Sequence, residues 1–78
     1  MEHLRTGEPL RLVLAANVRR YRNERGWSQE RLAEKSKLTQ VFVSRIETAK
    51  VAPTIDTVAA LARALEVDPS LLLVTHGQ

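Results

Sequence analysis

The 78-residue chain contains no cysteine, only three glycines, and one residue each of tryptophan, tyrosine and phenylalanine. Without cysteine there is neither a disulfide framework nor a thiolate metal site, which suits a reducing compartment. The longest apolar runs, at 12–16 and 71–74, are far shorter than the roughly 20 residues that span a bilayer. No charged-then-apolar signal sequence opens the chain, so we expect a cytoplasmic location.

Residues suited to catalysis or metal binding are also scarce. The two histidines, His3 and His76, lie near the chain ends. The chain has no glycine-rich loop that could cradle a phosphate, and no acidic pair that obviously shares a pocket. The sequence therefore predicts that the protein is not an enzyme, holds no metal, needs no cofactor, and has no evident pocket for a small-molecule effector.

Charge, by contrast, is present and unevenly distributed. Residues 1–50 hold eleven Lys/Arg against six Asp/Glu, a balance of +5, whereas residues 51–78 hold one against three, a balance of −2. The basic N-terminal part favours contact with a polyanion, and the mildly acidic C-terminal part leaves a second face for a different partner. The alternative is that a few surface arginines are simply unevenly placed.

Apolar residues recur at helical spacing along the chain, and nothing alternates as a strand does. The pattern predicts five helices, at about 9–25, 29–36, 40–48, 53–65 and 69–75. Ser28, Thr39 and Asp68 are expected to cap three of them, and Gly26 is expected to end the first. The sequence therefore predicts an all-α bundle in a single domain, residues 1–78, with a core of about 9–75.

The joint between the second and third helices is only a few residues long, around Lys37 and Leu38. Such a joint matches a helix-turn-helix, whose second helix enters the major groove of DNA by its N-terminal end. Small Ala33 would let the following helix cross closely. Two helices in any bundle can look alike, so the outward residues of the third helix must decide.

The expected outward face of that helix presents Gln40, Val41, Ser44, Arg45 and Thr48. An amide can pair with adenine, a guanidinium can pair with guanine, and a small apolar group can touch a thymine methyl. Taken singly, Val41 could be a scattered surface residue and Arg45 a solvated charge. Because this helix follows a short joint and lies in the basic part of the chain, the combination of these residues favours DNA binding.

The segments WSQERLAEKSKLTQVFVSRIETAK and LARALEVDPSLLL resemble the Cro- and phage-repressor-like (XRE-type) helix-turn-helix family. The likeness covers about residues 12–74. It rests on four short motifs, which contain Arg19, Arg22, Ser28, Gln29, Leu32, Ala33, Ser44, Arg45, Ile46, Glu47, Ala62, Ala64 and Leu65. The resemblance implies a five-helix lambda-repressor-like domain that regulates transcription, usually as a dimer on a palindromic operator, and it extends to the small controller proteins of restriction–modification systems.

The resemblance also implies site residues. The implied base-reading residues are Thr39, Gln40, Val41, Ser44 and Arg45. The implied phosphate contacts are Arg19, Gln29, Lys37, Thr48 and Lys50. Arg22 and Glu47 match a family ion pair that clips the first helix to the third.

Two positions depart from the family pattern. Lys37 and Ala49 stand where the family usually has glycine. If both positions keep a left-handed backbone conformation, each side chain carries some strain. Lys37 would also bring a cation near the DNA.

The run Leu71, Leu72, Leu73 and Val74 cannot all enter one small core, because a helix spreads four neighbours over all its faces. We expect the surplus to form a homodimer seam; the alternative is a frayed tail that partly covers the first helix. The expected partners are double-stranded DNA and a second copy of the chain, with no membrane.

A rival function is an antitoxin-like interaction module with secondary DNA binding, although few residues are spare at the ends.

Overall fold

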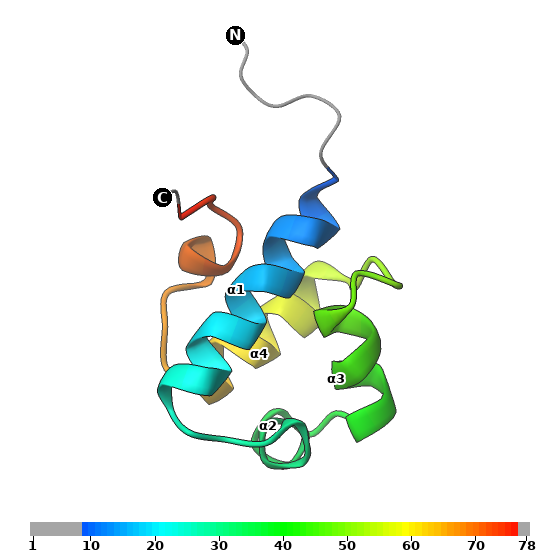
Figure 1. Ribbon diagram of the computed structural model, residues 1–78, viewed down its shortest axis with the longest axis vertical. Helices are drawn as coiled ribbons and strands as arrows, with labels where there is room; N and C mark the ends of the chain where they lie inside the picture. The colour runs from blue at the N-terminus through cyan, green and yellow to red at the C-terminus, as the bar shows by residue number, and fades with distance from the viewer. Residues whose placement is uncertain (1–8, 77–78) are drawn as a thin grey trace, which may run out of the picture.

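The computed structural model describes residues 9–76. Its elements, in chain order, are α1 (Leu10–Glu24), α2 (Gln29–Ser36), α3 (Gln40–Glu47), α4 (Ile55–Leu65) and the short 3₁₀ turn η1 (Pro69–Leu72) (Figure 1). The described residues contain no strand. The all-α prediction is therefore confirmed, and the four α-helices lie where the periodicity predicted them.

Side-chain caps set the beginnings of α2, α3 and α4. The hydroxyl oxygens of Ser28, Thr39 and Thr54 each accept from the backbone N–H three residues further on, at 3.0, 3.1 and 3.1 Å. Such a bond satisfies one of the amides that the first turn of a helix leaves without a partner. Gly26, at φ 71°, turns the chain after α1 in the left-handed region that glycine enters without strain. Pro9 is the N-cap of α1, so this helix begins at Leu10, one residue later than the predicted range.

The fifth predicted helix, over 69–75, is wrong in kind and in length. The chain makes one 3₁₀ turn, with N–H groups of Leu71 and Leu73 donating to the carbonyls of Asp68 and Ser70 at 2.9 and 3.1 Å. The Asp68 carboxylate accepts from the Ser70 amide at 2.9 Å and from its hydroxyl at 2.7 Å. The predicted cap is therefore present, but it caps a single turn.

A buried side chain of α1 explains why this turn does not continue. Asn17 is 4% exposed, and its Nδ2 donates to the carbonyls of Leu72 at 2.8 Å and Val74 at 2.9 Å. A longer helix would have needed the same carbonyls for its own backbone bonds. The segment is held along α1 further on, where the Tyr21 hydroxyl lies 3.3 Å from His76 Nε2.

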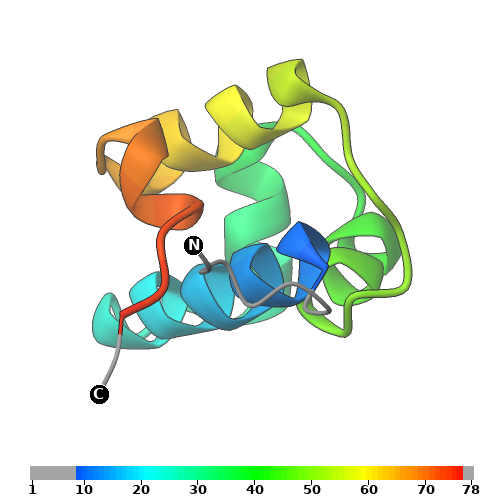
Figure 2. The same cartoon turned by 90° about the horizontal axis from the view of Figure 1, so that it is seen from above.

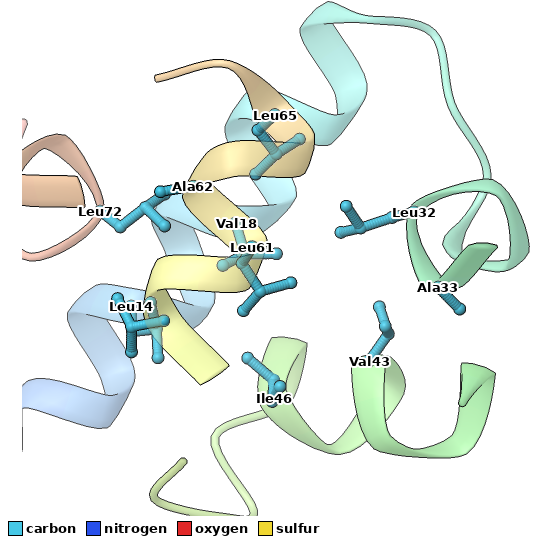
Figure 3. Packing of buried hydrophobic residues seen from close by; sticks show 11 residues of the cluster. Leu14, Val18, Leu32, Ala33, Val43, Ile46, Leu61, Ala62, Leu65 and Leu72 are labelled. Carbon is cyan, nitrogen blue, oxygen red and sulfur yellow. The ribbon is translucent and has the colours of Figure 1, made fainter. Parts of the chain in front are cut away.

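The core fills the space where all five elements meet. α1 packs against α3, α4 and η1, and α2 packs against α3 and α4, so that α2 lies between α1 and α4 when the molecule is seen from above (Figure 2). Figure 3 shows the buried side chains pointing toward one another from these elements. The most deeply buried, at 0–1% exposure, are Val18, Leu32, Val43, Ile46, Leu61, Ala62, Leu65 and Leu72. Burial of each large apolar side chain stabilises the fold by about 1.5–3 kcal/mol.

The burial of Leu72 corrects one prediction for the C-terminal run. Leu72 is completely buried against α1 and α4, so its predicted place in a dimer seam is wrong. Its neighbours Leu71, Leu73 and Val74 are 37%, 37% and 44% exposed. A 3₁₀ turn brings every third residue to the same side, so one leucine of the run enters the core and the next ones face outward.

Candidate nucleic-acid interface

The helix α3 has an inward face and an outward face. Val43, Ile46 and Glu47 are buried, whereas Val41 is 64% exposed and Arg45 is also exposed. Within the described part of the chain, the outward side chains of α3 from Gln40 to Arg45 make no hydrogen bond or ion pair. These groups are therefore available to a partner molecule.

The outward side chains line a shallow, open depression of about 550 Å³. Its lining residues come from the beginning of α2, from α3 and from the loop that follows, and they are Gln29, Gln40, Val41, Ser44, Arg45, Thr48 and Lys50. Seven of the ten base and phosphate contacts predicted from the sequence therefore converge on one surface. The other three, Arg19, Lys37 and Thr39, do not line it.

The charge of this depression is positive. Arg45 and Lys50 line it, and no acidic side chain does. Neither cation pairs with a carboxylate among residues 9–76. Concave positive surfaces of this kind attract a polyanion, since each neutralised phosphate releases a condensed counterion.

Gln29 lies where the depression meets the first turn of α2. Its Nε2 donates to Glu47 Oε1 at 3.0 Å, a bond that the sequence did not indicate. A second amide N–H and the carbonyl oxygen of Gln29 remain for other contacts. The backbone N–H groups at the beginning of α2 also favour a phosphate near this side chain.

A largely buried ion pair fixes α3 against α1. Arg22 Nε donates to Glu47 Oε2 at 2.7 Å, and its Nη2 donates to Oε1 at 3.0 Å, so the pair implied by the family resemblance is present. The remaining Nη1 donates to the Trp27 carbonyl at 2.7 Å. Glu47 is 1% exposed, and loss of one partner would leave a buried charge without compensation. The geometry therefore gives Arg22 a structural role.

Two further arginines of α1 hold the backbone at the end of α3. Arg19 Nη1 donates to the Glu47 carbonyl, and Arg11 Nε donates to the Ala49 carbonyl at 3.0 Å. Cations near the end of a helix also interact favourably with its dipole. Arg19 thus has a structural partner, and its predicted phosphate contact stays a prediction. No sequence signal pointed to Arg11, because its acceptor is a backbone carbonyl 38 residues away.

The turns on either side of α3 keep the left-handed geometry usual for glycine. Lys37 has φ 62° and Ala49 has φ 59°. The bonds that close such turns are present, from Leu38 N–H to the Ala33 carbonyl and from Lys50 N–H to the Arg45 carbonyl, both 2.9 Å. The sequence analysis expected strain at Lys37 and Ala49 if both kept a left-handed backbone conformation, and both do.

The two predicted threonine contacts have internal partners. Thr39 Oγ1 accepts the capping bond from Phe42 N–H at 3.1 Å. Thr48 Oγ1 donates to the Ser44 carbonyl at 2.8 Å. Each hydroxyl retains capacity for another hydrogen bond, so their contacts with DNA stay predictions.

Two other kinds of site were sought in the described part of the chain. It contains no group of three or more His, Cys, Asp or Glu side chains that could hold a metal ion. None of its helices combines the length and the apolar character needed to cross a membrane.

A short-jointed helix pair with unpaired polar and cationic groups on the outer face of its second helix defines a helix-turn-helix DNA-binding protein. The model of the helix-turn-helix family HTH_3 matches residues 18–72. The chain therefore belongs to this family, of the Cro- and phage-repressor-like (XRE) type.

Named relatives agree with this assignment. The control protein C.SmaI of Serratia marcescens is 40% identical over 65 residues, which are 83% of this chain and 77% of that protein. A hypothetical transcription factor of Neisseria meningitidis is 37% identical over 67 residues, 86% of this chain and 63% of that protein. The chain thus spans less than two thirds of the length of the second relative.

Solved structures show the same fold. The crystal structure of the hypothetical transcription factor NHTF from Neisseria has a TM-score of 0.86 at 34% identity, and covers 97% of this chain and 87% of that one. The restriction-modification controller protein C.AhdI from Aeromonas hydrophila has a TM-score of 0.77 at 29% identity, with 80% and 94% covered. These relatives are transcriptional regulators and controller proteins, not enzymes, and this chain is a DNA-binding transcriptional regulator of their type.

Proposed function

We propose that this regulator binds a palindromic operator as a homodimer, through one domain per copy, and controls restriction–modification genes. The observation that carries the proposal is the outward face of α3, where Val41 is 64% exposed beside an unpaired Arg45. The controller role is supported by the relatives C.SmaI and C.AhdI, whose names describe a control protein and a restriction-modification controller.

In the proposed complex, α3 reads base edges in the major groove. Arg45 pairs bidentately with guanine, Gln40 pairs with adenine, and Val41 covers a thymine methyl group; Ser44 and Thr39 add hydrogen bonds beside them. Residues four apart on a helix lie on one face, about 6 Å apart. Val41 and Arg45 therefore reach neighbouring base pairs of one half-site.

The phosphate contacts flank this helix. Lys50 and Thr48 lie beyond its C-terminal end, and Gln29 lies at the beginning of α2. Lys37 and Arg19 complete the proposed set from outside the depression. Affinity supplied by such contacts falls steeply with salt, whereas the base contacts supply the choice of sequence.

The proposed dimer seam lies at one end of the molecule. Leu10, Ile55 and Leu73 are 57%, 85% and 37% exposed, and together they line an apolar depression of about 190 Å³. Leu71 and Val74, which the sequence also assigned to the seam, are exposed but do not line this depression. A two-fold axis through this end would pair the surface with itself, and half-sites would then lie about one helical turn apart on the DNA.

The proposal is tested by selecting bound duplexes from a randomised library at about 0.15 M salt, where exposed charges are screened over about 8 Å. We expect an enriched palindrome with half-sites about ten base pairs apart. Enrichment of unpaired single half-sites would contradict the dimer, and recovery of a random pool from folded protein would contradict sequence reading altogether.

A matched pair of variants then separates base from phosphate contacts. On the selected operator, Arg45→Ala should cost about 1–3 kcal/mol and relax preference at one base position. Lys50→Ala should weaken all duplexes similarly and reduce the salt slope by about one. An equal loss on all sequences from Arg45→Ala would assign Arg45 to phosphate instead. Binding curves by fluorescence anisotropy at several salt concentrations provide both readouts.

A further inference from the structure

A second depression, of about 310 Å³, lies where the C-terminal ends of α2 and α4 approach each other. Its walls are built mainly from Trp27, Lys35, Lys37, Ala60, Arg63 and Ala64, and we refer to it as the Trp27 pocket. It shares no lining residue with the recognition depression. From α2 itself, the recognition depression takes only Gln29 in the first turn, whereas the Trp27 pocket takes Lys35 and Ser36 in the last turn.

The Trp27 pocket is positively charged. Lys35, Lys37 and Arg63 form no ion pair among the residues that the structure describes. The one acidic side chain in its wall, Glu66, is already paired with Arg25 at 3.2 Å. Three uncompensated cations around a concave surface concentrate positive potential within it.

Two of these cations have a simpler explanation, because Lys35 and Arg63 lie in the last turns of their helices and oppose the helix dipoles. Lys37 is the C-cap residue of α2, so the dipole explanation extends to it as well. Lys37 follows the end of α2 at φ 62°, where glycine would fit without strain. Its side chain lines the same concave surface as Lys35 and Arg63.

The floor of the pocket is apolar. Trp27 is half-buried, and small Ala60 and Ala64 face it from α4. The Arg25 guanidinium and the Lys35 ammonium lie 5.3 and 5.9 Å from the centroid of the Trp27 ring. An apolar floor with a cationic rim, of about 300 Å³ or more, is typical of sites for small ligands.

We propose that the Trp27 pocket binds a small polyanion that carries phosphate or carboxylate groups. Lys35, Lys37 and Arg63 supply the charge-assisted hydrogen bonds that such groups accept. The apolar floor lowers the local dielectric constant and strengthens these interactions. No effector site was evident in the sequence because these residues come from three separate segments.

The position of Lys37 links this pocket to DNA binding, a consequence that rests on the proposed function. Lys37 lies in the turn between α2 and α3, so an anion held by its ammonium restrains the position of the recognition helix. By thermodynamic linkage, an anion that changes operator affinity must have its own affinity changed by DNA by the same factor. The pocket would thereby make regulation sensitive to a cellular anion.

Trp27 allows a direct test because it is the only tryptophan in the chain. Purified protein without DNA is titrated with pyrophosphate and, separately, with citrate, at constant ionic strength maintained with sodium chloride. We expect a saturable change in Trp27 fluorescence with at least one of the two anions. Lys37→Gln and Arg63→Gln should each raise the half-saturation concentration about tenfold, since each removes one charge-assisted contact.

A matched control removes a cation elsewhere on the surface. Arg20 is exposed on α1, where it pairs with Glu24 at 3.4 Å, and Arg20→Gln should leave the half-saturation concentration unchanged. Thermal melts of all three variants establish that each is folded. The site is overturned if neither anion gives a saturable response, or if Arg20→Gln weakens binding as much as Lys37→Gln and Arg63→Gln do.

Two other occupants are separate outcomes that also overturn the proposal. A glutamate-rich peptide that binds saturably where pyrophosphate and citrate fail would identify an acidic protein segment as the partner. Duplex DNA that alone produces the Arg63-dependent response would identify an additional phosphate contact. Because the anion titration contains no DNA, its failure is distinguishable from failure of the proposed operator binding.

Discussion

Replacing Ala49 with glycine should stabilise this protein, although an alanine-to-glycine replacement usually lowers the free energy of unfolding. Ala49 has φ 59°, and the left-handed conformation costs an L-residue about 1–2 kcal/mol. Glycine relieves this strain, but it also raises the entropy of the unfolded chain, which costs about 0.4–1 kcal/mol. The midpoints of these two ranges differ by a net stabilisation of about 0.8 kcal/mol.

The hydrogen bonds around this position do not depend on its side chain. The Ala49 N–H donates to the Ile46 carbonyl at 3.1 Å, and the Ala49 carbonyl accepts from Arg11 Nε at 3.0 Å. Ala49→Gly therefore removes only a half-buried methyl group. Urea unfolding monitored by circular dichroism measures the free energy of unfolding. In a thermal melt, a gain of this size should raise Tm by about 2–8 °C.

Ala16→Gly is the matched control, because Ala16 is exposed in the interior of α1. There the same loss of a methyl group should cost about 1 kcal/mol, since glycine is a poor helix former. The free energy of unfolding should therefore be higher than that of the parent protein for Ala49→Gly and lower for Ala16→Gly. If Ala49→Gly lowers the free energy of unfolding as Ala16→Gly does, the left-handed strain assigned to Ala49 is not present in solution.

Three further predictions test other parts of the molecule. Leu73→Asp should yield monomers in sedimentation velocity at concentrations where the parent dimerises, whereas Val41→Asp, the same kind of change on α3, should not; a dimeric Leu73→Asp protein would place the seam elsewhere. Glu47→Ala should cost about 3–5 kcal/mol in urea unfolding, because it leaves the partly buried Arg22 guanidinium without its carboxylate partner, and a loss below about 1 kcal/mol would show that solvent reaches this pair. The side-chain and backbone hydrogen bonds from Ser70 lower the pKa of Asp68 below its usual value, so any stability contributed by this cap is present above the unfolded pKa of about 4 and is lost as the pH falls through the folded one; an NMR titration giving an ordinary pKa would contradict the cap.

Local features of the fold could be predicted because they depend on neighbouring residues. The predicted caps at Ser28 and Thr39 each act within one turn of the chain, and apolar spacing identified the four α-helices. The left-handed turns at Lys37 and Ala49 were expected only through the resemblance to a family with glycine there. The left-handed Glu66, at φ 58°, was not foreseen, since glutamate does not favour that conformation.

Features that depend on distant residues could not be predicted in this way. The end of η1 is set by Asn17, whose acceptors lie 55 and 57 residues further along the chain. A run of leucines carries no signal for which one is buried. Leu72 was therefore predicted to lie in the dimer seam, whereas it lies in the core. Arginines that donate to backbone carbonyls, as Arg11 does, leave no complementary acidic residue in the sequence to indicate the contact.

The separation of α3 into two faces has a consequence for how such regulators diverge. Val43, Ile46 and Glu47 hold the helix in place, and they point away from the surface that carries Val41, Ser44 and Arg45. Substitutions on the outer surface therefore leave core packing intact. If that surface reads DNA bases as proposed, mutations that alter operator choice can accumulate without first requiring a compensating gain in stability. A lineage of such proteins can explore many operators on one scaffold, and its limits are set by the DNA partners it encounters.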